Sequence, residues 1–133
     1  MVDIKNYNPE NVFAKILKGE IPYNKVFENE HVLGFKDINP QAPIHIVIIP
    51  KKNFCSYRDF SKNASTDELV NLMRSIGQIA EKMSLDEGYR IICNTGSLGI
   101  VKKCQLMKEF INSVFLPTNP ILTGVLGKKI PYY

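Results

Sequence analysis

His45 is the side chain of this sequence whose type and position most directly invite a chemical role. It lies within D-I-N-P-Q-A-P-I-H-I-V-I-I-P-K-K-N, residues 37–53, and it is one of two histidines among 133 residues. An imidazole changes its charge near neutral pH, so it can transfer a proton or hold an anion. A histidine in an apolar strand is also explained as a core residue whose hydrogen bonds are satisfied. The residues alone leave both interpretations open.

The strands expected to position His45 surround it in the sequence. The run I-H-I-V-I-I-P at 44–50 is rich in β-branched residues and predicts a central strand covered on both faces. The segments K-V-F-E-N and H-V-L-G-F-K-D, at 25–29 and 31–37, predict a hairpin. A further short strand is expected over Y-R-I-I-C-N at 89–94. We therefore expect an antiparallel sheet with His45 near its centre.

Two helices are expected beside this sheet. Asn8 followed by Pro9 is a favourable helix start, because Asn caps free N–H groups and Pro fits the first helical position. Ser65 and Glu68 have the spacing of a capping box, and apolar residues then recur at helical spacing over 66–83. A short helix, a hairpin, a strand, a long helix and a strand together predict one α+β domain.

Composition narrows the classes of partner. The chain has 17 basic and 13 acidic residues, a formal net charge of +4. Its lysines are scattered rather than gathered into the dense stripe of a nucleic-acid-binding protein. The longest apolar run, 44–49, is far shorter than the roughly 20 residues of a membrane span. We therefore expect a small-molecule ligand, with no nucleic acid and no membrane as partner.

The cysteines and the N-terminal segment indicate in which cellular compartment the protein is expected. Cys55, Cys93 and Cys104 lie far apart and form no C-x-x-C pair, which fits buried thiols in a reducing environment. The first residues contain no basic stretch followed by an apolar one, so no secretory signal is predicted. A cytoplasmic protein is expected, and the pattern points to no metal or cofactor.

Three motifs in this order carry a family resemblance. F-x-K-I-L-K-G-E-I-P, F-x-D-I-N-P-Q-A-P-x-H and I-P-K-K follow one another between residues 12 and 99, about two thirds of the chain. This stretch resembles the histidine triad family, in particular its Hint-like branch. The resemblance implies the histidine triad fold, an antiparallel sheet with one long and one short helix. It also implies a homodimer that binds a purine nucleotide such as AMP or GMP.

The resemblance further implies a nucleotide site. Its members are the apolar Phe13, Ile16, Phe35 and Ile38 around the base, Asp37 for the ribose hydroxyls, His45 beside the phosphate, and Asn94 for the phosphate or the leaving group. Each has a structural alternative, because the apolar residues would belong to the core in any fold. Asp37 and Asn94 would likewise suit turns.

The catalytic signature of the family is missing from its expected place. Family enzymes carry three alternating histidines after a Gly-Gln stretch, and the middle one is the nucleophile. No histidine follows His45 in this sequence. The resemblance therefore implies a nucleotide-binding core over 1–99, followed by a divergent C-terminal segment over 100–133 in which the apolar spacing over 101–114 predicts a helix. Either the tail has diverged on an intact core, or a change of reading frame has replaced it.

Three functions follow from these observations. The favoured one is a purine nucleotide-binding protein with little or no catalysis, and no catalytic residue is assigned. The second is an active nucleotidyl hydrolase or transferase acting on nucleoside phosphoramidates or dinucleoside polyphosphates. The third is an interaction protein with a vestigial pocket. Titration with AMP separates the first from the third, and turnover separates the second from both.

Overall fold

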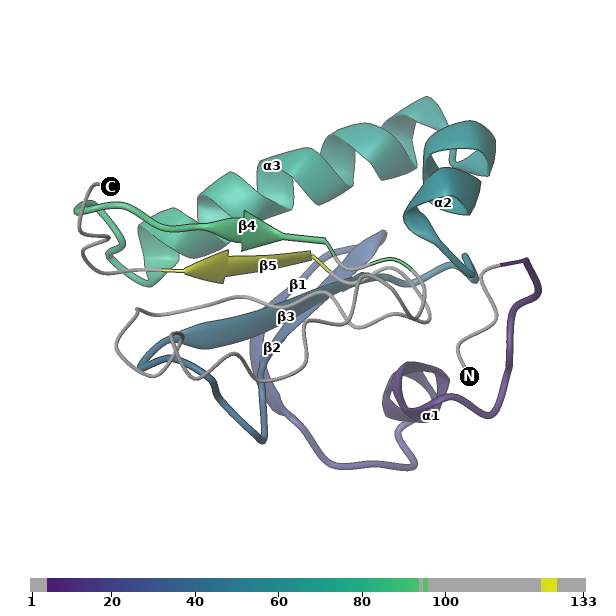
Figure 1. The fold of residues 1–133 in the computed structure, drawn as a ribbon, viewed down its shortest axis with the longest axis horizontal. Helices are drawn as coiled ribbons and strands as arrows, with labels where there is room; N and C mark the ends of the chain where they lie inside the picture. The colour runs from purple at the N-terminus through teal and green to yellow at the C-terminus, as the bar shows by residue number, and fades with distance from the viewer. Residues whose placement is uncertain (1–4, 94, 96–122, 127–133) are drawn as a thin grey trace.

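The computed structural model describes residues 5–93, 95 and 123–126 (Figure 1). Its elements are α1 Val12–Leu17, β1 Asn24–Glu28, β2 Val32–Lys36, β3 His45–Pro50, α2 Tyr57–Asn63, α3 Thr66–Lys82, β4 Ile91–Ile92 and β5 Thr123–Leu126. The strands form one antiparallel sheet in the order β1-β2-β3-β5-β4. The α+β prediction is confirmed.

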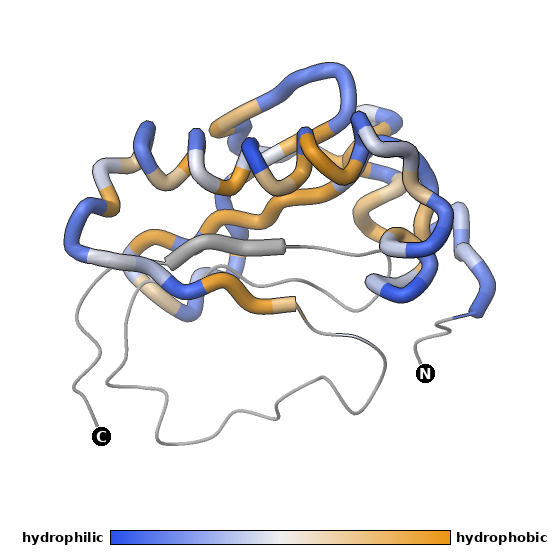
Figure 2. Tube along the Cα trace, turned by 90° about the horizontal axis from the view of Figure 1, so that it is seen from above, coloured by the Kyte–Doolittle hydropathy of each residue, from blue (hydrophilic) through white to orange (hydrophobic). Residues whose placement is uncertain are grey.

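The central strand β3 is buried along its whole length, as its continuous apolar sequence predicts. Because side chains alternate along a strand, Ile46 and Ile48 pack with residues of α3 on one face. Val47 and Ile49 pack with residues of α1 on the other. Figure 1 shows α3 and α1 on opposite sides of the sheet, and in Figure 2 the apolar colour follows the strands while the turns are hydrophilic.

The long helix α3 begins where the capping box predicts. The Ser65 hydroxyl accepts a hydrogen bond from the Glu68 N–H at 3.1 Å, and the Glu68 carboxylate accepts one from the Ser65 N–H at 2.7 Å. The two bonds satisfy N–H groups that the first turn would otherwise leave unpaired. The inner face of the helix then buries Leu72, Ile76 and Ile79 against the sheet.

The predicted start of the first helix is wrong. α1 begins at Val12, and Asn11 caps it by accepting from the N–H groups of Phe13 and Ala14, each at 2.9 Å. Asn8 instead closes the preceding turn, since its side-chain oxygen accepts from the Glu10 N–H at 2.9 Å. Both asparagines are suitable caps, and the second lies directly before the buried apolar face of the helix.

Two further elements differ from expectation. The strand expected over 89–94 is confined to Ile91–Ile92. The helix α2, Tyr57–Asn63, was not predicted, because Phe60 is its only buried residue and gives no apolar periodicity. β5 comes from the segment expected to diverge, whereas the helix predicted over 101–114 lies outside the described residues.

Candidate functional site

Three of the four predicted base-contacting residues meet on the α1 side of the sheet. Phe13 and Ile16 come from α1 and Phe35 from β2, and all three are buried in one cluster with Val47. The shared face follows from the helical spacing of the first two and from strand alternation. The rings of Tyr23 and Phe35 meet edge to face at 5.7 Å between centroids, which fixes the outer side of the cluster.

The fourth predicted base-contacting residue, Ile38, has different surroundings. Ile38 follows the end of β2 and is 81% exposed, an unusual position for a large apolar side chain. The structure therefore does not bring it into the cluster with Phe13. Asn94 lies outside the described residues.

Asp37 and His45 are adjacent across two strands. The register pairs Lys36 with Ile46, and the Asp37 N–H donates to the His45 carbonyl at 3.0 Å, one step further along. Alternation then places both side chains on the same face of the sheet as Phe35 and Val47. His45 Nε2 and Asp37 Oδ2 are 3.2 Å apart. The two polar residues singled out in the sequence thus lie in direct contact beside the apolar cluster.

The hydrogen bonds of His45 determine its tautomer. The Gln41 N–H donates to Nδ1 at 3.0 Å, so Nδ1 carries no proton. The proton of the neutral ring is therefore on Nε2, the nitrogen that lies 3.2 Å from Asp37 Oδ2. Only 1% of the side chain is exposed. Burial lowers the pKa of His45 below its ordinary value, although the Asp37 carboxylate acts in the opposite direction.

Asp37 is held at both carboxylate oxygens. Oδ1 accepts from the Asn39 N–H at 2.8 Å, which forms the turn before Pro40, and Oδ2 lies 3.2 Å from His45 Nε2. A carboxylate offers about four lone-pair positions, so these two contacts leave acceptor capacity on both oxygens. The side chain is 23% exposed. A turn-capping role is therefore present, and it is compatible with binding a hydroxyl-bearing ligand.

The sequence does not predict two backbone donors of this site. The N–H groups of Asn39 and Gln41 lie in the turn between β2 and β3 and fix Asp37 and His45 respectively. Backbone groups carry no sequence signal of their own. The signal available for them was the N-P-Q sequence, which is typical of a tight turn.

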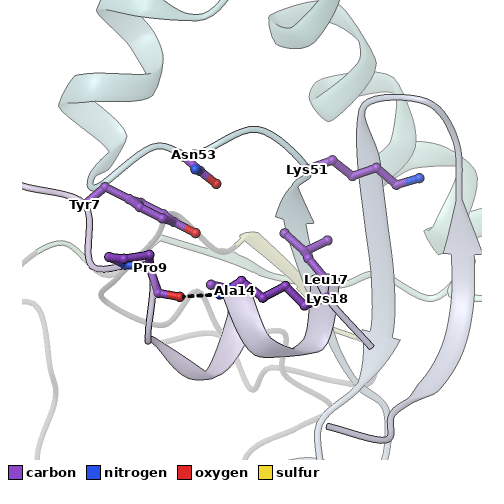
Figure 3. Close-up of a pocket in the computed structure, with 7 residues that line it drawn as sticks. All are labelled: Tyr7, Pro9, Ala14, Leu17, Lys18, Lys51 and Asn53. Carbon is purple, nitrogen blue, oxygen red and sulfur yellow. Dashed lines mark hydrogen bonds between the residues drawn. The ribbon is translucent and has the colours of Figure 1, made fainter. Parts of the chain in front are cut away.

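A separate pocket of about 150 Å³ lies on another side of α1 (Figure 3). It is lined by Tyr7, Pro9, Ala14, Leu17, Lys18, Lys51 and Asn53, none of which was predicted to bind nucleotide. Lys18 lies 3.8 Å from Glu10 and donates to the Pro9 carbonyl at 3.2 Å, and Lys51 lies 2.8 Å from Glu28. Its two cations are thus already paired with carboxylates, which weakens it as an anion site.

The part of the chain that the structure describes contains no candidate metal site and no candidate membrane-spanning helix. There, no three His, Cys, Asp or Glu side chains are grouped as metal ligands would be. Among the same residues, no helix has the length and apolar character needed to cross a membrane.

Comparison with known proteins agrees with this architecture. The family model described as scavenger mRNA decapping enzyme C-terminal binding matches residues 10–96. A 13.2 kDa histidine triad (HIT)-like protein of Azospirillum brasilense is 52% identical over 93 residues, 69% of this chain and 76% of that protein.

Solved structures give the same result. A histidine triad protein from Clostridium difficile has a TM-score of 0.73 and 32% identity, covering 96% of this chain and 99% of that chain. A HIT family hydrolase from Legionella pneumophila Philadelphia 1 has a TM-score of 0.70 and 32% identity, with coverage of 90% and 93%. The resemblance of the three sequence motifs to the histidine triad family is confirmed at the level of the family, and the chain belongs to the histidine triad family.

Proposed function

We propose that this chain binds a purine nucleotide such as AMP or GMP and has little or no catalytic activity. The observation that carries the proposal is the Asp37–His45 pair next to the apolar cluster of Phe13, Ile16 and Phe35. A nucleotide presents an apolar base, a pair of hydroxyls and an anion in that order. The site offers apolar surface, a carboxylate with spare acceptor capacity and an imidazole within one short segment.

Each part of the ligand has a partner in this proposal. The base contacts Phe13, Ile16, Phe35 and Ile38, the ribose hydroxyls donate to Asp37, and the phosphate lies on the side of His45 and Asn94. The 81% exposure of Ile38 supports the assignment, because a purine laid against it would remove a large apolar side chain from water. A nearby phosphate would also favour the protonated form of His45.

The absence of catalysis follows from the histidines. A histidine nucleophile needs an accessible lone pair on a ring nitrogen. At His45, Nδ1 accepts from the Gln41 N–H, and Nε2 carries the proton and lies 3.2 Å from Asp37 Oδ2. No histidine follows His45 in the sequence, so the alternating triplet of family enzymes is not available in residues 46–133.

A titration and a turnover assay test this proposal together. Calorimetry with AMP and with GMP should give saturable binding, and incubation with an adenosine phosphoramidate should release no more AMP than buffer alone. Release of AMP that scales with protein concentration would favour the alternative, a nucleotidyl hydrolase or transferase. The similarity to the HIT family hydrolase of Legionella pneumophila, at 32% identity, is the observation in favour of that alternative. If neither AMP nor GMP binds, the result favours the third hypothesis, an interaction protein with a vestigial pocket.

We also propose a two-fold homodimer through α3 and β4. Val70 and Met73 are 37% and 66% exposed on one side of α3, and Tyr89 and Ile91 are 42% and 48% exposed at β4. β4 is an outer strand of the sheet, so its free edge suits pairing with a second copy. Light scattering should give twice the chain mass, and Ile91→Glu should give a monomer. A monomeric unmodified protein at high concentration would contradict this interface.

A cytoplasmic location remains part of the proposal. It rests on the cysteines, because Cys55 and Cys93 form no disulfide and a thiol is kept reduced in that compartment. Fractionation of cells that express the full chain would test it.

A further inference from the structure

We infer that His45 is a positioning residue for ribose recognition: it holds the Asp37 carboxylate in the orientation that accepts the ribose hydroxyls, and so selects ribonucleotides over 2′-deoxyribonucleotides. The inference rests on the proposed function and deepens it. In the proposed function, His45 lies beside the phosphate. In the further inference, it acts through Asp37 on the ribose, which carries no charge.

The geometry forms a chain of close polar contacts. The Gln41 N–H donates to His45 Nδ1 at 3.0 Å, and Nε2 lies 3.2 Å from Asp37 Oδ2. From the other side, the Asn39 N–H donates to Asp37 Oδ1 at 2.8 Å. Each oxygen of the carboxylate is thereby fixed from a different direction. Its remaining lone pairs then have set directions before any ligand arrives.

The burial of the ring makes this arrangement stiff. His45 is 1% exposed and stands on the first residue of β3, where pairing with β2 on one side and β5 on the other fixes its backbone. Asp37, by contrast, is 23% exposed and lies just beyond the end of β2. A carboxylate at a strand end has rotational freedom that costs entropy when it is ordered by a ligand. His45 removes that freedom in advance.

The substitutions that test this differ in hydrogen bonding. His45→Gln keeps one donor and one acceptor in an uncharged side chain, whereas His45→Leu keeps neither. His31→Gln is the matched control, because His31 is the other histidine and its contacts in the described structure are made by its backbone. The ligands are adenosine, 2′-deoxyadenosine and AMP, so the phosphate is present in only one of the three.

The expected results separate the two roles of His45. In the unmodified protein, adenosine should bind about 10-fold more tightly than 2′-deoxyadenosine, as expected for a hydrogen bond to a charged acceptor. His45→Leu should bring that ratio close to one, and His45→Gln and His31→Gln should keep it within about 3-fold of the original value. If His45→Leu weakens AMP but leaves the adenosine ratio unchanged, His45 serves the phosphate alone and the inference is wrong.

A measurement on the unmodified protein tests the inference even if a His45 variant does not fold. Adenosine should shift the ¹⁵N resonance of His45 Nε2, because the ribose hydroxyls and the imidazole share the Asp37 carboxylate. The His31→Gln variant assigns the signal, since His45 is then the only histidine. An unmoved His45 resonance with adenosine bound would overturn the inference. A protein that binds neither adenosine nor AMP would overturn the proposed function itself, and with it this inference.

Discussion

Gly34 of β2 lies so close to Ile79 of α3 that a β carbon on the glycine would stand 2.9 Å from Ile79 Cδ1. The same carbon would be 3.4 Å from Phe27 Cβ. Ile79 is fully buried, so its side chain has little room to move aside. The glycine therefore sets how closely the long helix approaches the sheet, on the face opposite the candidate site.

Replacing this glycine should destabilise the fold without altering the site. For Gly34→Ala we expect a loss of about 1 to 3 kcal/mol in the free energy of unfolding, because the added methyl group overpacks the core. Urea denaturation measures it. Gly77→Ala is the matched control: nothing lies within 4 Å of its β-carbon position in α3, and a gain of about 0.5 to 1 kcal/mol is expected for a helix interior. Equal stability of the two variants would contradict the packing described.

The capping box of α3 should give a pH-dependent contribution to stability. The Ser65 N–H lowers the pKa of Glu68, so this contribution is present above the ordinary pKa of 4.5 and is lost as the pH falls through the lower folded value. Ser65→Ala leaves the Ser65 N–H in place and removes only the hydroxyl cap, so it should cost about 0.5 to 2 kcal/mol at both pH 7 and pH 3. Ser61→Ala, whose hydroxyl donates to the Arg58 carbonyl in an exposed turn of α2, should cost less. Thermal melts at pH 7 and pH 3 measure both.

Asp37→Ala should weaken AMP binding by about 1.5 to 3 kcal/mol, roughly 10- to 150-fold in the dissociation constant, because the ribose loses a charged acceptor. Calorimetry measures the change. Asp86→Ala removes an exposed carboxylate elsewhere on the surface and should leave the affinity unchanged. If both variants bind AMP as the unmodified protein does, Asp37 is a turn residue and no more.

The buried imidazole should make stability depend on pH below neutrality. Burial lowers the pKa of His45 from 6.5, so the unfolded chain takes up a proton at a higher pH than the folded chain does. Stability should therefore be complete above about pH 6.5 and fall as the pH drops toward the folded value. Urea denaturation between pH 7.5 and 5.5 measures this slope. His45→Gln should flatten it; a steeper slope in His45→Gln would contradict the assigned neutral state.

The sequence predicts well those features that short segments determine. The Ser65–Glu68 box and the apolar run of β3 each depend on a few neighbouring residues, and both are present. Asn8 was mistaken for the cap of α1 because two suitable caps stand three residues apart and propensity does not separate them. Local patterns thus locate an element better than they locate its first residue.

The candidate site was predictable in its members but not in its contacts. The motifs mark Asp37 and His45, whereas the contact between their side chains depends on the register of β2 against β3. The proton on Nε2 depends in turn on a backbone N–H at Gln41. Exposure of Ile38 was also beyond the sequence, because an apolar residue beside a turn is usually expected in the core.

The position of β5 between β3 and β4 has a consequence for synthesis of the chain. Val47 pairs with Gly124, so one edge of the central strand has no partner until the ribosome has made residues 123–126. At typical elongation rates this delay is on the order of 10 s. Throughout it, β3 exposes a row of unpaired backbone groups next to strongly apolar side chains, the kind of edge that recruits other chains. Of the strands that the structure describes, β5 is made last, so we expect the newly made protein to be most prone to aggregation before residues 123–126 are available.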